Sequence, residues 1–252
     1  MRGRAFFVVA VLGAGVAAAL VPTLTAAGGA PRPSAAGTVL LGRSVEGRPI
    51  VALRLGDPRS RRKALVVGPI HGDEPGGLRV TAALRRMKRI GGVDLWLVER
   101  PNPDGLARGT RRNAHGVDLN RNFPRHWRRS SRASAYYGGP RPLSEPESRI
   151  LARLLVRLRP RVSVWYHQPY GFVVLPAART APYAVTRVAR RYALLARWPG
   201  HRLARLPGTA VDWANRRLPG TASFVVELGG EGPSPATAMR HARAAARLAA
   251  GR

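Results

Sequence analysis

The chain contains no cysteine. Disulfide bonds and thiolate metal sites are therefore excluded, and any metal ion must be held by histidine, aspartate or glutamate side chains. Aromatic residues make up only 6% of the chain, whereas hydrophobic residues make up 45% of its 252 positions. A chain of this length and composition can bury one sizeable core. We therefore expect a single folded domain that needs no disulfides, even outside the cell.

Acidic residues are also scarce. The 13 aspartates and glutamates face 43 lysines and arginines, which gives a net charge of +30. Such a charge attracts anionic wall polymers, lipid headgroups and nucleic acid. However, the arginines are spread along the whole chain and form no basic motif with interleaved aromatic residues. We expect non-specific adhesion to anionic wall polymers or lipid headgroups at most, with no specific nucleic acid and no obligate protein partner.

Long hydrophobic runs are confined to the N-terminus. Arg2 and Arg4 precede an apolar run over residues 5–21, and small residues follow at 26–30. This layout is typical of a secretory signal peptide, although the run approaches the roughly 20 residues of a membrane anchor. We predict a signal peptide or N-terminal membrane anchor over 1–30, a flexible linker over 31–37 and a catalytic domain over 38–252. The protein would then be exported, and either secreted or associated with the cell envelope.

Beyond residue 38, short β-like runs alternate with helical stretches. This alternation predicts an α/β domain whose sheet is covered by helices on both faces. Ser144 is expected to cap one helix, with Glu147 reaching back to it. The segment 100–146 shows little regular pattern. The expected elements are a hairpin of 39–41 and 50–55, buried strands at 64–70, 93–98, 162–167 and 223–228, and helices at 78–90 and from 144 onward.

Three predicted strands carry a titratable residue at or near their carboxyl ends: His71, His167 and Glu227. The crevice beyond the carboxyl ends of the strands is the usual ligand site of an open α/β sheet. Glu227 follows the apolar run SFVV, and a carboxylate there is costly to bury unless it is paired or used. A general base beside a metal-activated water is such a use.

The segment PIHGDEPGG supplies a His-x-x-Glu pair, His71 and Glu74. Catalytic zinc takes three protein ligands and keeps one position for water, so His167 would complete the set. Alternatively, Glu74 is an acidic residue at a helix N-terminus, and His167 is a hydrogen-bonded core histidine. The remaining histidines, His115, His126, His201 and His241, fit no metal set and are expected at the surface or in loops.

The order of four motifs identifies a family resemblance. HGDE, NPDG, GVDLNRNFP and SEPE, followed by a strand ending in His and a later one ending in Glu, closely resemble the zinc metallocarboxypeptidase family that includes carboxypeptidase A. HGDEPGG, RRNAHGVDLNRNFP and YHQP are most similar to its bacterial murein peptide amidase branch. The resemblance covers the chain from about residue 38 onward. It implies a single-domain α/β/α sandwich with a mixed, mostly parallel central sheet.

The resemblance also implies roles for single residues and one Zn²⁺ per chain. Glu227 would be the general base and later the proton donor, and Arg111 would polarise the scissile carbonyl. The adjacent Arg112 is the alternative for this role; if Arg111 fills it, Arg112 is expected to contact the substrate. A guanidinium can grip a carboxylate bidentately, which suits a substrate-binding role. The implied zinc ligands are His71, Glu74 and His167, and the implied substrate-binding residues are Asn120 and Arg121.

The sequence departs from the pancreatic members of the family in two places. Those members carry arginine at the position of Asp73 and a substrate-contacting tyrosine ahead of the catalytic glutamate. This chain has no tyrosine between Arg202 and Glu227. The departure puts ordinary C-terminal trimming of peptides in doubt, whereas it leaves the zinc chemistry untouched. The specificity pocket, expected to be lined largely by residues 170–217, matches no motif.

The sequence thus predicts an exported zinc metallopeptidase that hydrolyses an amide bond next to a residue with a free carboxylate. The expected substrate is a peptide, most specifically the γ-D-Glu–diaminopimelate bond of cell-wall murein peptides. One alternative is a general secreted carboxypeptidase, and another is a deacylase similar to aspartoacylase. An alternative from a different functional class is a non-catalytic cationic module that binds the cell wall.

Overall fold

A computed structural model describes residues 37–87, 90–176 and 183–252. The predicted signal peptide or anchor at 1–30 lies outside these ranges, as does the predicted linker at 31–37 except for Gly37. Among the helices within the described ranges, none is long and apolar enough to cross a membrane.

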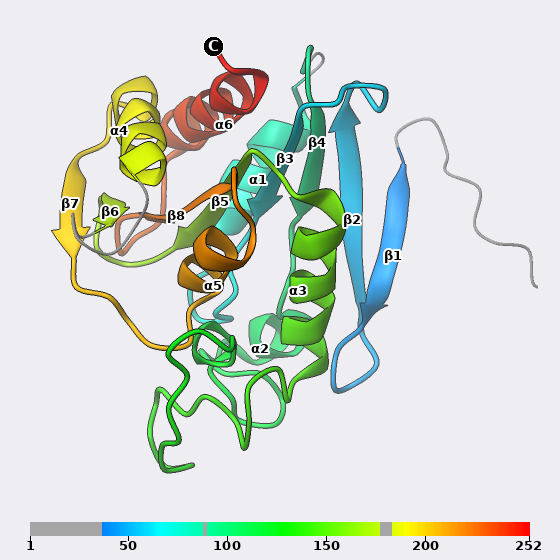
Figure 1. The fold of residues 1–252 in the computed structure, drawn as a ribbon, viewed down its shortest axis with the longest axis vertical. Helices are drawn as coiled ribbons and strands as arrows, with labels where there is room; N and C mark the ends of the chain where they lie inside the picture. The colour runs from blue at the N-terminus through cyan, green and yellow to red at the C-terminus, as the bar shows by residue number, and fades with distance from the viewer. Residues whose placement is uncertain (1–36, 88–89, 177–182) are drawn as a thin grey trace, which may run out of the picture. The chain divides into compact units, whose positions relative to one another are not determined.

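One sheet organises the described residues (Figure 1). Its eight strands lie in the order β1, β2, β4, β3, β5, β8, β6, β7 within the described part of the chain. Four neighbouring pairs are parallel and three are antiparallel, which confirms a mixed, mostly parallel sheet. The strands are β1 (Thr38–Arg43), β2 (Pro49–Gly56), β3 (Lys63–Val67), β4 (Asp94–Val98), β5 (Val162–His167), β6 (Val173–Pro176), β7 (Gly200–Leu203) and β8 (Ala222–Glu227).

Helices cover both faces of this sheet, as expected. Helices α1 (Gly76–Arg85), α4 (Tyr183–Ala196) and α6 (Pro235–Ala250) pack on one face, and α3 (Pro146–Leu158) and α5 (Ala210–Arg217) pack on the other (Figure 1). Successive strand residues therefore enter two different cores: Val66 faces the first layer and Leu65 the second. This double burial explains why the central strands are apolar without alternation. The segment 100–146 is mostly irregular but includes α2 (Pro103–Arg108) and a 3₁₀ turn (Leu119–Arg121).

The strand boundaries follow from local chemistry. The predicted strand 162–167 matches β5, all of whose residues are buried. The strand predicted over 64–70 ends earlier, at Val67. Gly68 still donates to the carbonyl of Val98, but the next residue, Pro69, has no N–H with which to continue the ladder. The helix expected over 78–90 corresponds to α1, which begins at Gly76 and ends at Arg85.

The capping role predicted for Ser144 is wrong. Helix α3 begins at Pro146, and its N-cap Glu145 makes no capping hydrogen bond. The Ser144 hydroxyl instead donates to Glu145 Oε1 at 2.7 Å, and the fully buried Glu147 accepts hydrogen bonds from the backbone N–H of Val45 and from Asn113 Nδ2. Both carboxylates therefore hold distant loops together, and this tertiary demand overrides the local capping pattern.

The prediction that His241 lies at the surface is also wrong, whereas His115, His126 and His201 are exposed as expected. His241 lies inside α6 with no exposed surface, and its Nδ1 is 2.8 Å from the hydroxyl of Tyr192 on α4. That hydroxyl is 2.9 Å from the hydroxyl of Tyr166 on β5. Burial, reinforced by the charge of Arg240, lowers the pKa of His241 to about 4. The imidazole is therefore neutral at physiological pH.

We expect this neutral imidazole to make stability depend on pH. The unfolded chain takes up a proton near pH 6.5 and folded His241 does not, so stability falls as pH drops below 6.5. The neighbouring Tyr166 and Tyr192 stay neutral there, because burial raises the pKa of both. From pH 6.5 to pH 5, the free energy of unfolding of the wild type should fall by about 1.5 kcal/mol on account of His241, and His241→Gln should abolish this fall. Urea unfolding at both pH values measures this difference, and equal slopes for the two proteins would contradict it.

Candidate active site

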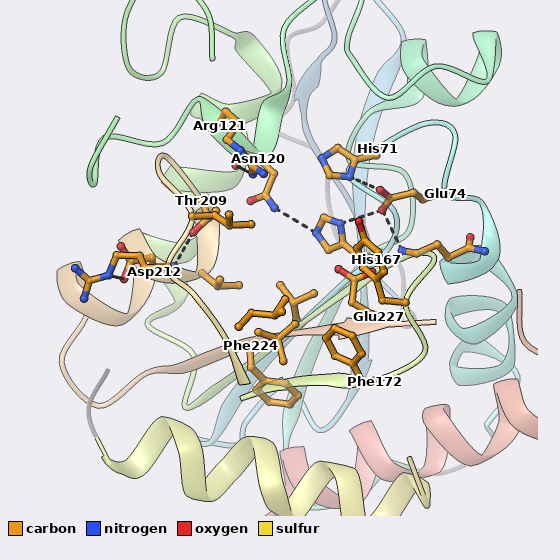
Figure 2. A pocket seen from close by; sticks show the side chains of 18 of the residues that line it. His71, Glu74, Asn120, Arg121, His167, Phe172, Thr209, Asp212, Phe224 and Glu227 are labelled. Atoms are coloured by element: carbon orange, nitrogen blue, oxygen red, sulfur yellow. Dashed lines mark hydrogen bonds and ion pairs between the residues drawn. The ribbon is translucent and has the colours of Figure 1, made fainter. Parts of the chain in front are cut away.

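The predicted site residues meet at the carboxyl edge of the parallel strands. In the ladder of β5 and β8, His167 stands opposite Glu227, and β3, whose continuation carries His71, pairs with β5 on its other side. All three side chains line one cavity of about 950 Å³ (Figure 2). The register of three neighbouring strands thus brings together residues that are far apart in the sequence.

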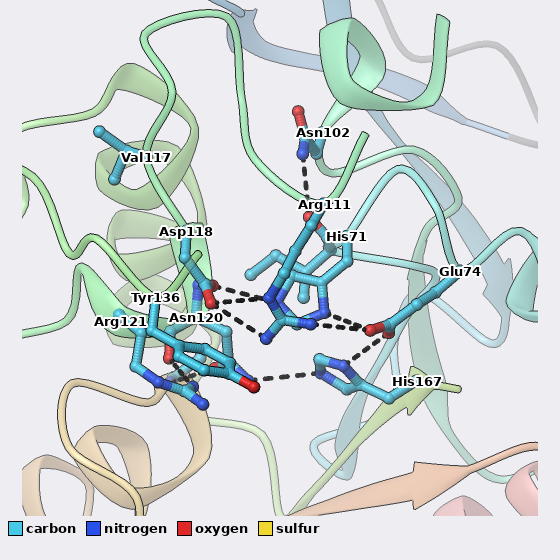
Figure 3. Close-up of polar contacts among 12 residues, drawn as sticks. His71, Glu74, Asn102, Arg111, Val117, Asp118, Asn120, Arg121, Tyr136 and His167 are labelled. Atoms are coloured by element: carbon cyan, nitrogen blue, oxygen red, sulfur yellow. Dashed lines mark hydrogen bonds and ion pairs between the residues drawn. The ribbon is translucent and has the colours of Figure 1, made fainter. Parts of the chain in front are cut away.

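His71, Glu74 and His167 form a compact group of metal-ligating atoms. Glu74 Oε1 lies 2.7 Å from His71 Nδ1, and Glu74 Oε2 lies 2.9 Å from His167 Nδ1 (Figure 3). All three side chains are buried, and one ligand atom from each lies within 4.8 Å of the others. Two imidazole nitrogens and one carboxylate are a donor set that zinc takes in hydrolytic sites, with a position left for water. The group therefore fits a zinc ion.

The turn that carries His71 and Glu74 rests directly on the NPDG segment. A Cβ at Gly72 would lie 1.9 Å from the carbonyl carbon of Gly105, so only glycine allows this approach. Asn102 braces the same turn, because its Nδ2 donates to the carbonyl of Ile70 and its Oδ1 accepts from the N–H of Gly105. Two motifs that are separate in the sequence therefore form one support for the metal ligands.

Asp118 supports the site, although it was not singled out from the sequence. Its Oδ1 lies 3.0 Å from His71 Nε2, and its Oδ2 accepts a hydrogen bond from Arg111 Nε at 3.0 Å. Burial disfavours the ionised form, but His71 and Arg111 outweigh it and bring the pKa of Asp118 to about 2. An ionised carboxylate at this position can accept a proton from His71 Nε2, and in that tautomer Nδ1 would be the nitrogen that binds a metal ion. Its position inside GVDLNRN was the only available signal.

Arg111 and Arg112 point to different places. Arg111 lines the cavity and donates to both Asp118 and Glu74. Burial lowers the pKa of its guanidinium, but the two carboxylates more than reverse this effect. Arg112 donates to the carbonyls of Arg132 and Ser134 and does not line the cavity, so this geometry gives no support to its predicted contact with substrate.

Asn120 and Arg121 lie on the opposite side of the cavity from Glu74 (Figures 2 and 3). Asn120 Oδ1 accepts the backbone N–H of Ala210, which orients its Nδ2 to within 3.5 Å of His167 Nε2. Burial and the nearby charge of Arg111 lower the pKa of Arg121, and no carboxylate among the described residues pairs with it. A guanidinium in these surroundings is suited to an incoming carboxylate.

Glu227 is buried at the end of β8, with 8% of its surface exposed. Its Oε2 is inaccessible to solvent and has no hydrogen-bond partner within the described part of the chain. Burial raises the pKa of this carboxyl group, although the charge of His167 opposes the effect. A buried carboxylate with one oxygen that lacks a hydrogen-bond partner, next to a metal-binding group, has the properties of a general base.

Tyr136 is the second residue that sequence analysis missed. It lies in the irregular segment between Arg121 and α3, and 57% of its surface is exposed. The guanidinium carbons of Arg111 and Arg121 are each 5.3 Å from the centre of its ring (Figure 3). This distance is within the range of a cation–π contact. No local pattern distinguishes Tyr136 from the adjacent, buried Tyr137.

The fold and the side chains define a mononuclear zinc site at the carboxyl edge of an α/β sheet. The chain belongs to the zinc carboxypeptidase family, whose model matches residues 29–247. It is 34% identical to murein peptide amidase A of Escherichia coli K12 over 156 residues, which cover 56% of this chain and 62% of that protein.

Two solved structures show the same fold. The murein-tripeptide amidase of Escherichia coli O157 matches with a TM-score of 0.65 and 25% identity over 88% of this chain and 93% of that chain. Carboxypeptidase A of Helicoverpa armigera matches with a TM-score of 0.72 and 21% identity over 85% of this chain and 68% of that chain. The predicted α/β/α sandwich of the zinc carboxypeptidase type is therefore confirmed.

We expect Asp118→Asn to weaken zinc binding by about 10- to 100-fold, because a neutral amide replaces the ionised acceptor that orients His71. Competition with a chromogenic chelator measures the affinity. Asp94→Asn is the matched control, since Asp94 is equally buried and paired with an arginine, Arg54, but lies at the start of β4. An equal loss of affinity in both variants would show that Asp118 acts only on overall stability.

Removing the ring of Tyr136 should weaken the binding of free carboxylates. We expect Tyr136→Ala to raise the Kd of a carboxylate-terminated peptide about 5- to 10-fold, because Arg121 loses a cation–π contact, while Tyr136→Phe stays within about 2-fold of the wild type. Calorimetry with the acid and its amide measures the effect. Tyr170→Ala serves as control, because Tyr170 is 67% exposed and lines the same cavity. Equal losses for acid and amide would contradict the prediction.

Proposed function

We propose that this protein is an exported zinc-dependent amidase that hydrolyses an amide bond next to a residue with a free carboxylate. The bond we infer is the one between γ-D-Glu and diaminopimelate in murein peptides. One observation carries the proposal: the group of His71, Glu74 and His167 shares a cavity with Glu227 and with the arginines Arg111 and Arg121. Membership of the zinc carboxypeptidase family and similarity to murein peptide amidase A support it.

In this proposal His71, Glu74 and His167 hold the zinc ion. Bound zinc supplies Lewis acidity, which lowers the pKa of a bound water toward 7 and polarises a carbonyl oxygen. Glu227 takes the proton from the attacking water and later gives it to the leaving amine, so that one carboxylate serves as base and then as acid. Its Oε2 has no hydrogen-bond partner among the described residues, so no structural contact has to break for either transfer.

The arginines have separate tasks. Arg111 is held by Asp118 and Glu74 beside the metal group, so its guanidinium can stabilise negative charge that develops on the carbonyl oxygen. Asn120 and Arg121 bind the carboxylate of the leaving residue, because an amide N–H and a guanidinium can donate to it together. With these roles, the proposed reaction is hydrolysis of a bond next to a carboxylate-bearing residue.

The choice of a murein substrate rests on two further observations. The family relative with 34% identity is named murein peptide amidase A, and its matched region spans 62% of its length. Independently, the N-terminal pattern of Arg2, Arg4 and the apolar run at 5–21 favours export, which would bring the enzyme to the cell wall. The net charge of +30 would keep the protein close to anionic wall polymers.

The decisive experiment incubates the zinc-loaded protein with L-Ala-γ-D-Glu-diaminopimelate and follows free diaminopimelate by mass spectrometry. We expect release by the wild type, complete loss on chelation and recovery with added zinc. Glu227→Gln should lower the rate at least 100-fold, because the base is removed and the ligand set is kept. Glu231→Gln, a change at an exposed glutamate four residues away, should leave the rate unchanged.

Two results would contradict the proposal. If the protein binds one zinc ion but releases no diaminopimelate, the murein substrate is wrong, and a library of ordinary peptides with free C-termini tests the general carboxypeptidase. If it binds no zinc and adsorbs to purified wall in a salt-sensitive but chelator-insensitive way, it is a cationic binding module.

A further inference from the structure

A hydroxyl group without a partner lines the inner part of the active-site cavity. Ser223 on β8 is 1% exposed, and its Oγ has no hydrogen-bond partner within the described part of the chain. The residue belongs to the lining of the same cavity as Glu227. Buried polar groups in native proteins are nearly always hydrogen-bonded, so an exception that faces a cavity points to a ligand atom.

The strand geometry gives the position of this hydroxyl. Side chains alternate along a strand, so Ser223, Val225 and Glu227 share one face of β8. At about 3.3 Å per residue, Ser223 lies roughly 13 Å along the strand from Glu227. A side chain that enters the cavity beside Glu227 must therefore be long to reach the Ser223 hydroxyl.

Part of the cavity lining is apolar, and polar residues such as Asn215 and Asp212 line it as well. Val174 of β6, Leu203 of β7, Val211 of α5 and Val225 of β8 all line the cavity. They can pack against methylene groups, but they offer no hydrogen bond to a polar end group. Such a lining selects for a side chain with an aliphatic stem, and the hydroxyl is a donor and acceptor for its tip.

Ser223 is also held rigidly. Asn215 on α5 donates from Nδ2 to the carbonyl of Ser223 at 2.8 Å and accepts the N–H of Ser223 at Oδ1 at 2.7 Å. On the other side, Ser223 stands opposite Ser163 in the parallel ladder with β5. The backbone of Ser223 is thus bonded on both sides, whereas its buried hydroxyl has no partner among the described residues.

We propose that Ser223 is a specificity-determining residue whose hydroxyl binds a polar group at the far end of the leaving residue's side chain. This inference rests on the proposed function, since it assigns the cavity to the leaving residue. Diaminopimelate has the required chemistry, because its aliphatic stem ends in an amino and a carboxylate group. A side chain of similar length that ends in a methyl group would leave the hydroxyl unsatisfied.

The test compares two leaving residues in the wild type and in Ser223→Ala. Diaminopimelate and norleucine, whose aliphatic side chain has no polar end, are each placed after L-Ala-γ-D-Glu and, separately, at the C-terminus of an ordinary N-acylated dipeptide. We expect Ser223→Ala to lower kcat/KM for diaminopimelate release about 10-fold or more, as expected for a lost hydrogen bond to a charged group. Norleucine release should stay within about 2-fold, which also shows that the variant is folded.

Ser148→Ala is the matched control. Ser148 on α3 is also fully buried with a partnerless hydroxyl, but it does not line the cavity. Its loss should leave the ratio of diaminopimelate to norleucine release unchanged. If Ser223→Ala also leaves this ratio unchanged, or if the wild type prefers norleucine on both scaffolds, the inference is overturned.

The two scaffolds separate this inference from the proposed function. Release from the dipeptides alone, with a preference for diaminopimelate that depends on Ser223, would overturn the murein substrate and support the role of Ser223. Release from the murein peptides without any such preference would support the proposed function and overturn the role of Ser223.

Discussion

The parallel register of β3, β5 and β8 is the constraint on which the site depends. His167 and Glu227 are partners in one ladder, and the chain beyond β3 delivers His71 and Glu74 beside them. A shift of one residue in β8 would turn Glu227 away from the cavity and Phe224 out of its core. The two apolar cores hold this register because alternate strand residues are fully buried in each of them. Packing on both faces of the sheet therefore positions the metal-binding group.

Acidic residues are scarce, and most of them have a structural role. Seven of the 13 are buried: Glu74, Asp94, Asp104, Asp118, Glu145, Glu147 and Glu227. Most of the seven hold a loop, an arginine or a histidine in place, and Glu227 is the one whose buried Oε2 has no hydrogen-bond partner within the described residues. A buried charge is tolerated when it is paired, so this difference marks Glu227 as a residue kept for chemistry. Because the acids lie inside, the surface is even more cationic than the composition suggests.

The fold and much of the site could be predicted because the signals were local. The run VSVWYH is apolar on both faces and forms β5, and HGDE together with the histidine that ends this run predicted the metal-binding group. The errors arose where contacts with distant segments determine the position of a side chain. Glu147 serves Val45, which is 102 residues away, and His241 is buried because Tyr192 on another helix meets its ring. Tyr136 and Arg112 take their directions from an irregular segment, whose conformation no periodic pattern encodes.

Strands β6 and β8 both contribute residues to the cavity but pair at a single position. Near the catalytic end, β8 and β6 are still joined: Glu227 N–H donates to the carbonyl of Phe172, and Val226 pairs with Val173. Beyond this single ladder pair, β6 continues beside β7 and no longer pairs with β8. Val174 and Ser223 both line the space that opens between them. Substitutions in β6 and β7 can therefore reshape the inner cavity without disturbing the register of β3, β5 and β8, so that specificity can change while the metal-binding group is kept.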